Sequence, residues 1–217
     1  MVEHFKITLL SPLFYYTRTE SGVASTSPFI GDLALTYATN FAFCKDRELT
    51  YLMREKPEYE ELKRLGFLWS VARPLNFRRT RIFANSSSFG NDGARSFSTL
   101  VALKGGGAQP LYKDFRLVQG IEGGSTFQAS LLGDLELPER FTLRVGNGRE
   151  CLLLLERVDK LEKDAWMNLY TLKLFGEELE VREGLTFEPV LAQYILVKGL
   201  GEEDLERLER RLFGCGR

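Results

Sequence analysis

The sequence contains a single histidine, His4, and this scarcity limits the chemistry open to the chain. Metal sites built on histidine, Ser-His-Asp triads and paired-histidine ribonuclease chemistry all need imidazole groups that are missing here. A lone imidazole can still act as a general base, but at the start of a strand it is more often a surface or edge residue. We therefore expect no catalytic residue and no metal site.

Cysteine is also scarce. Cys44, Cys151 and Cys215 lie far apart without a CxxC pair, which argues against a disulfide framework or a cysteine-ligated zinc site. No apolar run approaches the ~18 residues of a membrane helix, and the amino terminus lacks the basic and apolar regions of a signal peptide. The pattern predicts a soluble protein of the reducing cytoplasm that needs no cofactor and no membrane.

Positive charge is missing from the chain as a whole but present in its middle. The net charge of -1 argues against a nucleic-acid partner, because proteins that bind phosphate backbones usually carry a positive excess. Residues 70–120, however, hold eight basic and two acidic side chains, a local charge of +6, whereas residues 156–217 hold ten basic and fourteen acidic ones, a charge of -4. The middle should attract phosphate and the last third should repel it.

The first half of the chain predicts one strand and two helices. Residues 4–10 alternate as a strand does, and Ser27-Pro28 resembles an N-cap followed by the first residue of a helix. That helix would point one set of residues inward, namely Ile30, Leu33, Ala34, Tyr37, Ala38 and Phe41, and another outward, namely Asp32, Thr36 and Asn40. A shorter helix is predicted at residues 57–65.

The remainder reads mostly as strands. The strand-like runs are FLWSVA, TRIFA, STLVALK, FRLV, TFQASLL, FTLRV, CLLLLERV, LYTLKLF and AQYILVK. A final helix follows, with Leu205, Leu208 and Leu212 on one face. This order predicts an α+β, ferredoxin-like (RRM-like) domain elaborated by long β-hairpins, and we take residues 1–217 as a single domain.

The basic middle of the chain should project from this domain. NSSSFGNDGARS and KGGGAQP are rich in glycine and serine, and compact connections usually have only ~4–6 residues, so residues 77–120 predict an extended hairpin or loop. Its basic residues, with Arg73 just before it, are candidates for contact with a nucleic-acid backbone: Arg73, Arg78, Arg79, Arg81, Arg95, Lys104 and Arg116. Phe77 and Phe83 could stack on bases. The alternative is a solvated strand edge protected by charge.

Three further loops carry residues that could contact a nucleotide or an anion. Arg18, Thr19, Glu20 and Ser21 in TRTESG could hydrogen-bond a nucleotide, although such a loop is usually only a turn. RVGNGRE reads as a hairpin turn from which Arg144 and Arg149 could reach phosphate. GLGEED has the glycines of an anion-binding loop, but its acids, Glu202, Glu203, Asp204 and Glu206, favour a purely structural role at a helix start.

The segment LLSPLFYYTRTESGVASTSPFIGDLALTYATNFAF, with LALTYA at residues 33–38, resembles the amino-terminal signature of the type I-D CRISPR Cas-five family (Csc-one). The resemblance implies a RAMP-type ferredoxin-like fold with a protruding thumb, here the basic projection. It also implies a Cascade subunit for antiviral defence that binds the five-prime repeat handle of the guide RNA (crRNA) and caps a row of backbone subunits. Tyr16, Arg18, Thr19 and Ser21 match the loop that would meet the handle, whereas Glu20 would be structural.

On this resemblance the expected partners are the crRNA, the backbone RAMP subunits and the large subunit of the type I-D ribonucleoprotein. Contact with target DNA near its flanking motif is left open. Two alternatives to a non-catalytic RNA-binding subunit remain. The chain could be a metal-independent endoribonuclease that processes precursor crRNA with His4, Tyr16 or a lysine as base. It could also be an adaptor whose basic segment meets an acidic protein.

Overall fold

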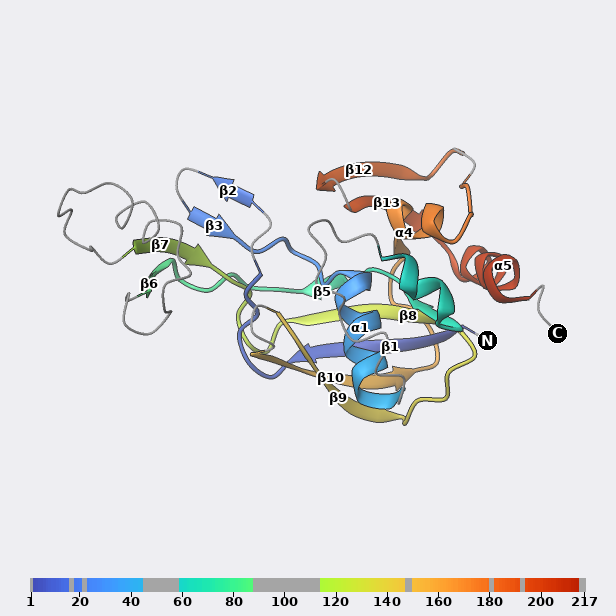
Figure 1. Ribbon diagram of the computed structural model, residues 1–217, viewed down its shortest axis with the longest axis horizontal. Helices are drawn as coiled ribbons and strands as arrows, with labels where there is room; N and C mark the ends of the chain where they lie inside the picture. Colours follow the sequence, from blue (N-terminus) through green and yellow to red (C-terminus); the bar gives the residue numbers. More distant parts are fainter. Residues whose placement is uncertain are drawn as a thin grey trace, which may run out of the picture.

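The computed structural model describes residues 2–15, 18–20, 23–44, 59–87, 114–146, 150–179, 182–191 and 194–214. Within these residues the chain forms three β-sheets: a main sheet, a smaller three-stranded sheet and a four-stranded sheet that extends away from both (Figure 1). The expectation of a mixed α and β fold is confirmed. No helix among the described residues is long and apolar enough to cross a membrane.

The main sheet has the strand order β4-β8-β1-β10-β9, with β5 also paired to β8. Its strands are β1 (Glu3–Leu9), β4 (Phe67–Trp69), β5 (Arg73–Asn76), β8 (Thr126–Gly133), β9 (Arg140–Val145) and β10 (Cys151–Val158). Every described pair in it is antiparallel. A ferredoxin-like sheet contains a split βαβ unit. The strand pairs described above do not test that unit, so the ferredoxin-like connectivity stays a prediction.

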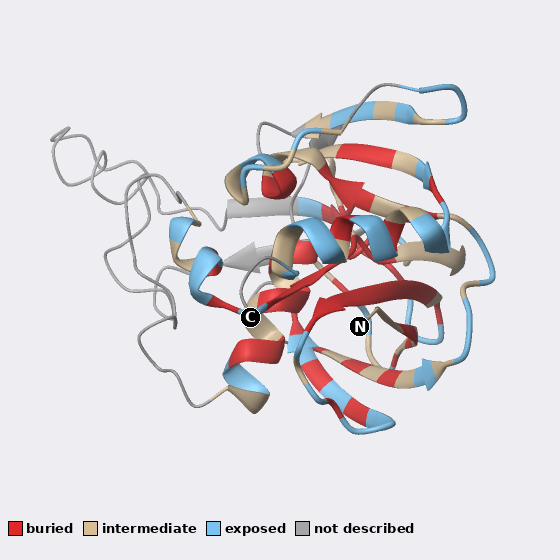
Figure 2. Cartoon of the chain, turned by 90° about the vertical axis from the view of Figure 1, so that its right-hand side faces the viewer, coloured by how far each residue is buried: buried red, intermediate tan, exposed pale blue. Residues whose placement is uncertain are grey.

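Alternation along the strands builds the main core on one face of this sheet. On β1 the side chains of Phe5, Ile7 and Leu9 are buried, and on β9 buried and exposed residues alternate strictly. Because successive side chains point to opposite faces of a strand, these apolar residues all meet on one side. Figure 2 shows the buried residues gathered in the strands and on the inner sides of the helices.

Helix α1 (Asp32–Phe43) covers this core, and it begins later than predicted. The expected start at Ser27-Pro28 is wrong, because Ile30 is still extended and exchanges two backbone hydrogen bonds with Ala72. The N-cap is Gly31, and a Cβ at that position would lie 2.2 Å from the Oη atom of Tyr194. Glycine therefore allows the chain to pass close to this tyrosine as it turns into the helix.

The buried side of α1 was predicted only in part, since Leu33 is buried and Ala34, Tyr37 and Ala38 pack against the main core as expected. Asp32, Thr36 and Asn40, expected outside, are buried, and Phe41, expected inside, is 62 % exposed. Only Asp32 finds side-chain hydrogen-bond partners in a neighbouring element, because the Oγ1 atom of Thr36 and the Oδ1 atom of Asn40 are buried with no partner among the described residues. Asp32 accepts hydrogen bonds from Asn168 and Thr171.

A short 3₁₀ helix, Glu60–Arg64, occupies the described part of the helix predicted at residues 57–65. Its Leu62 is buried in the main core, and Glu61 accepts a hydrogen bond from the Tyr37 hydroxyl of α1. The element is therefore confirmed in place but is shorter and tighter than an α-helix over the residues described.

The second sheet has the order β11-β13-β12 and carries the last two helices. Its elements are β11 (Ala165–Asn168), α4 (Leu169–Leu174), β12 (Thr186–Leu191), β13 (Tyr194–Leu200) and α5 (Glu202–Phe213). The strand predicted at LYTLKLF is wrong, because these residues form α4. The Asn168 side chain caps the helix by accepting from the backbone N–H of Tyr170.

Helix α5 closes a second core, as the leucine spacing predicted. Leu205 and Leu208 are buried, Leu212 packs beside them, and all three meet Leu68 and Leu132 of the main sheet. The face of the main sheet opposite α1 is thus covered over β4 and β8. Over β9 the same face is open, where Thr142 and Arg144 are exposed.

The third sheet, which we call the arm, has the order β2-β3-β7-β6 and lies at the left of Figure 1. It consists of β2 (Arg18–Glu20), β3 (Val23–Ser25), β6 (Phe83–Ser87) and β7 (Asp114–Gln119). β6 and β7 lie within the projection predicted at residues 77–120 and pair antiparallel, and the thumb itself stays a prediction. STLVALK lies outside the described residues. Unforeseen is the parallel pairing of β3 with β7.

Candidate nucleic-acid interface

Three arginines lie where the arm leaves the main sheet. Arg78, Arg79 and Arg81 follow β5 and precede β6, and all three are exposed. They enter neither core, because they belong to a segment that crosses between two sheets. The predicted basic cluster is therefore on the surface at the base of the arm.

The backbone beneath these arginines is held firmly. The N–H of Arg78 donates to the Ser125 hydroxyl, and the carbonyl of Arg78 accepts from the N–H of Glu122. Thr80 and Gly120 exchange a backbone hydrogen bond and a side-chain one. Since a fixed backbone reduces the entropy lost on binding, the arginines are presented from a preorganised ridge.

Arg79 also reaches across to the chain that follows β3. Its Nη1 atom donates to the carbonyl of Thr26 at 3.0 Å. Within the described residues this contact uses one of the five guanidinium N–H donors, and the others remain for a ligand. Arg79 thereby marks the edge of a cleft between the arm base and the three-stranded sheet.

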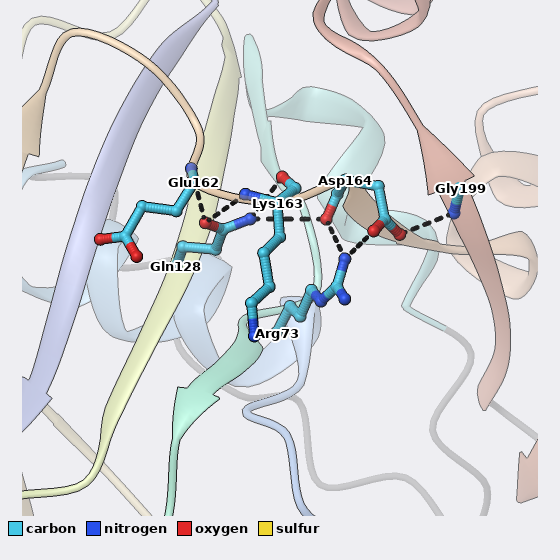
Figure 3. A network of polar contacts seen from close by, with 6 residues as sticks. All are labelled: Arg73, Gln128, Glu162, Lys163, Asp164 and Gly199. Carbon is cyan, nitrogen blue, oxygen red and sulfur yellow. Dashed lines mark hydrogen bonds and ion pairs between the residues drawn. The ribbon is translucent and has the colours of Figure 1, made fainter.

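Arg73, predicted to contact nucleic acid, instead links β5 of the main sheet to the loop that precedes β11 of the three-stranded sheet (Figure 3). Its guanidinium pairs with Asp164 and donates to the Asp164 carbonyl, and its side chain is only 19 % exposed. Asp164 in turn accepts from the N–H of Gly199 at 2.9 Å. Gln128 bonds the preceding loop through Glu162 and Lys163. This geometry supports a structural role for Arg73.

A bulge at Gly199 leaves its backbone N–H free of the strand ladder, and this N–H donates to the carboxylate of Asp164. The pairing of β11 with β13 slips between Ala165 and Trp166, and Gly199 is left at the bulge with φ of 92°. A bulged glycine N–H takes no part in the ladder, so the carboxylate satisfies it. After the slip Trp166 lies opposite Lys198.

The structure brings two separately predicted segments into one sheet. Arg18 and Thr19 lie in β2 opposite Ser25 and Ala24 of β3, and β3 pairs with β7, which contains Arg116. Arg144 lies instead on the open face of the main sheet, on β9. The remaining candidates, Tyr16, Ser21, Arg95, Lys104 and Arg149, lie outside the described residues.

A cleft of about 300 Å³ opens beside Arg79. Its lining comes from the segment after β3, the arm base and all three strands of the smaller sheet: Ser25, Thr26, Ser27, Pro28, Phe29, Arg79, Gln119, Trp166, Glu188, Val190, Leu196 and Lys198. Sequence reasoning missed this cleft, because Trp166 and Lys198 lie in strands with no local motif. The sequence shows only that one of these residues is aromatic and the other basic, which suits nucleic-acid binding but does not locate a cleft.

Trp166 is held in place by two cations. The Nζ atom of Lys198 lies 4.3 Å from the ring centroid, and the Cζ atom of Arg73 lies 5.3 Å from it. Such contacts are attractive because the ring face carries negative charge. Lys198 also pairs with Glu188 at the edge of the cleft.

His4 was expected at the surface or at a sheet edge, but it lies on β1, the central strand of the main sheet. It is buried, and its Nδ1 lies 2.9 Å from the Ser130 hydroxyl. Burial lowers the pKa of His4, and the nearby Glu202 raises it by a smaller amount. The adjoining hollow is rich in carboxylates, among them Glu206 and Glu209, which would repel RNA.

The acidic GLGEED loop has the structural role that was preferred for it. Gly201 is the N-cap of α5, and the Asp204 carboxylate accepts from the Gly201 N–H at 2.9 Å and pairs with Arg182. The acids therefore stabilise the helix start, where the backbone N–H groups are unpaired. Among the described residues no group of three His, Cys, Asp or Glu side chains is placed to hold a metal ion.

Comparison with known proteins identifies a family, and the solved structures that match include a distant likeness. Residues 1–179 match the family model described as type I-D CRISPR-associated protein Cas5/Csc1. A solved chain from the type III-B Cmr-beta complex bound to cognate target RNA and AMPPnP is 9 % identical, with a TM-score of 0.42 over 91 % of this chain and 84 % of that one. The curated proteins contain no match.

Proposed function

Because the chain belongs to the type I-D CRISPR-associated Cas5/Csc1 family, we propose that it is a non-catalytic, guide-RNA-binding subunit of a type I-D Cascade. It binds the five-prime repeat handle of the crRNA and caps the filament of backbone subunits. The handle, the backbone subunits and the large subunit are its partners. Its RAMP-type, ferredoxin-like fold with a thumb belongs to the same proposal.

The observation that carries the proposal is the ridge formed by Arg78, Arg79 and Arg81. Their side chains are exposed, their backbone is fixed by hydrogen bonds to residues 120–125, and the arm extends beyond them. Arginine forks match the spacing of phosphate oxygens and form bidentate contacts. A ridge of this kind suits the backbone of a single strand better than a protein surface without phosphate.

Neutralising the ridge tests the proposal. The variant R78Q/R79Q/R81Q should bind handle RNA about 100-fold more weakly at 0.15 M salt, because hydrogen bonds to charged groups contribute about 1.5–3 kcal/mol each and two of the three suffice. Fluorescence anisotropy of labelled RNA measures the affinity. The control R207Q/R210Q/R211Q removes three exposed arginines from α5 and should bind as the wild type does. Equal affinity of the two variants would contradict the proposal.

The proposal that the chain does not cleave RNA is tested separately. His4 is buried beside carboxylates, so no described imidazole is placed to deprotonate a ribose 2′-hydroxyl. Repeat RNA incubated with the purified chain in the presence of EDTA should stay intact. Cleavage at a defined position that is lost in His4→Ala or Tyr16→Phe would make the chain an endoribonuclease.

A further inference from the structure

The cleft beside Arg79 has the size and lining of a site for one nucleotide. Its volume of about 300 Å³ lies at the lower end of the range for small-molecule sites, about 300–1,000 Å³. We propose that it holds one unpaired nucleotide of the bound RNA, with the base against Trp166 and the phosphate on Arg79. This inference rests on the proposed RNA-binding function and adds a specific subsite to it.

Trp166 is a suitable surface for a base because it is already fixed. Its carbonyl accepts from the N–H of Val71 at 2.8 Å, and Lys198 and Arg73 hold its ring. An immobilised ring loses little entropy when a second flat ring packs on it. Pro28 and Leu196 complete an apolar wall around the same space. The base would therefore be recognised by stacking, which tolerates any sequence.

Arg79 supplies a positive charge for the phosphate. Its contact with the Thr26 carbonyl orients the guanidinium without neutralising it, since a carbonyl carries no formal charge. Gln119, Ser25 and Ser27 are polar residues of the same lining. The cleft therefore combines a cation, polar residues and an aromatic ring, which suit the phosphate, the ribose and the base of a nucleotide.

Glu188 limits the affinity of this site. Its carboxylate pairs with Lys198, and its side chain is 54 % exposed. A partly exposed ion pair is weak, so the carboxylate still repels a phosphate bound at Arg79 in the same cleft. Glu188→Gln should strengthen RNA binding by about 3- to 10-fold at low salt, because it removes that repulsion.

Tryptophan fluorescence reports whether the cleft is occupied. The chain has two tryptophans, and Trp69 is fully buried in the main core, where it donates to Thr39. Trp166 alone lines the cleft. Titration of the full chain with an unstructured handle RNA should change the emission, and Trp166→Phe should abolish that change. Anisotropy of the labelled RNA measures binding independently of the tryptophan signal.

A scan with abasic nucleotides locates the base that enters. Removing the base at one position should weaken binding to the wild type by about 10-fold, since stacking of one base on an aromatic ring is worth that much or more. In Val190→Trp, which fills the cleft, the same abasic RNA should bind no more weakly than the intact RNA. The control Thr142→Trp places the same side chain on an exposed position of β9 and should behave as the wild type.

The outcomes separate this inference from the function on which it rests. If RNA binds through the ridge while Trp166 emission is unchanged and no abasic position matters, the cleft site is overturned and the RNA-binding function stands. If RNA does not bind at all, both fall. A change in Trp166 emission caused by a neighbouring subunit without RNA would assign the cleft to a protein contact and also overturn the inference.

Discussion

A buried acid, Asp32, lies where the first helix meets the smaller sheet. It is 1 % exposed, and its oxygens accept from Thr171 and Asn168. Burial raises the pKa of Asp32 to about 6, against the opposing effect of these hydrogen bonds. Its position in the first turn of α1 also favours the ionised form. Desolvation outweighs both effects, so this carboxyl stays protonated in the folded protein up to about pH 6.

The raised pKa predicts how stability depends on pH. Because the folded-state pKa lies above the ordinary value near 3.9, the folded chain binds more protons than the unfolded chain between about pH 4 and pH 6. The free energy of unfolding, relative to Asp32→Asn, should therefore fall by about 2 kcal/mol as the pH rises from 4 to 7. Urea unfolding of both proteins at each pH measures this. A difference that stays constant would show that folding does not raise the pKa of Asp32.

The basic character of the middle of the chain is visible in the sequence, but the residues that its arginines contact could not be predicted. Arg73 and Arg78 look alike in RPLNFRR, yet Arg73 pairs with Asp164 from a distant loop and Arg78 points to solvent. Nothing local distinguishes them, because the decisive contact depends on how β5 and β11 are brought together. The same holds for Trp166, whose neighbours come from three segments of the chain.

Among the elements, those with a clear period were predictable. The alternation in β9 and the leucine spacing of α5 correspond directly to the buried faces observed. The buried side of helix α1 was predicted only in part, because its apolar residues are spread around the helix and the burial of Asp32 depends on contacts with Asn168 and Thr171. The strand predicted at LYTLKLF was wrong because a run with an aromatic residue and threonine suits a strand, whereas the residue before it, Asn168, caps a helix.

The partial cover of the main sheet gives a prediction about its strands. Leu132 on β8 and Leu154 on β10 lie on the same face, on either side of β1. Leu132 is fully buried under α5, whereas Leu154 is half-buried. Leu132→Ala should lower the free energy of unfolding by about 2–5 kcal/mol and Leu154→Ala by about 1 kcal/mol or less. Chemical denaturation decides, and similar losses would mean that β10 is covered as well.

On the scale of the whole molecule, the charge asymmetry read from the sequence corresponds to a separation in space. The exposed arginines lie at the base of the arm, and the acidic helix α5 lies beyond the smaller sheet, on the other side of the main sheet (Figure 1). Composition could predict this polarity because charge is additive along a segment. The cleft could not be predicted in the same way, since it exists only where the base of the arm approaches the three-stranded sheet.

Salt dependence tests this polarity. Binding of single-stranded RNA should weaken linearly with the logarithm of salt concentration, with a slope of about 0.7 for each phosphate neutralised. The variant R78Q/R79Q/R81Q should therefore lower the slope by about 2, whereas R207Q/R210Q/R211Q on α5 should leave it unchanged. Anisotropy titrations between 0.05 and 0.3 M salt, about a sixfold range, provide the slopes. A slope shared by all three proteins would place the phosphate contacts elsewhere.

The parallel pairing of β3 with β7 determines how the arm can be engineered. Val23 lies opposite Leu117, so β3, and with it β2, comes from the segment ahead of α1, while β6 and β7 come from the middle of the chain. A fragment cut at residues 77 and 120 would carry an unpaired β7 edge, and exposed edges promote aggregation. Transplanting the arm onto another scaffold, or exchanging it between relatives, therefore requires residues 18–25 to be moved together with it.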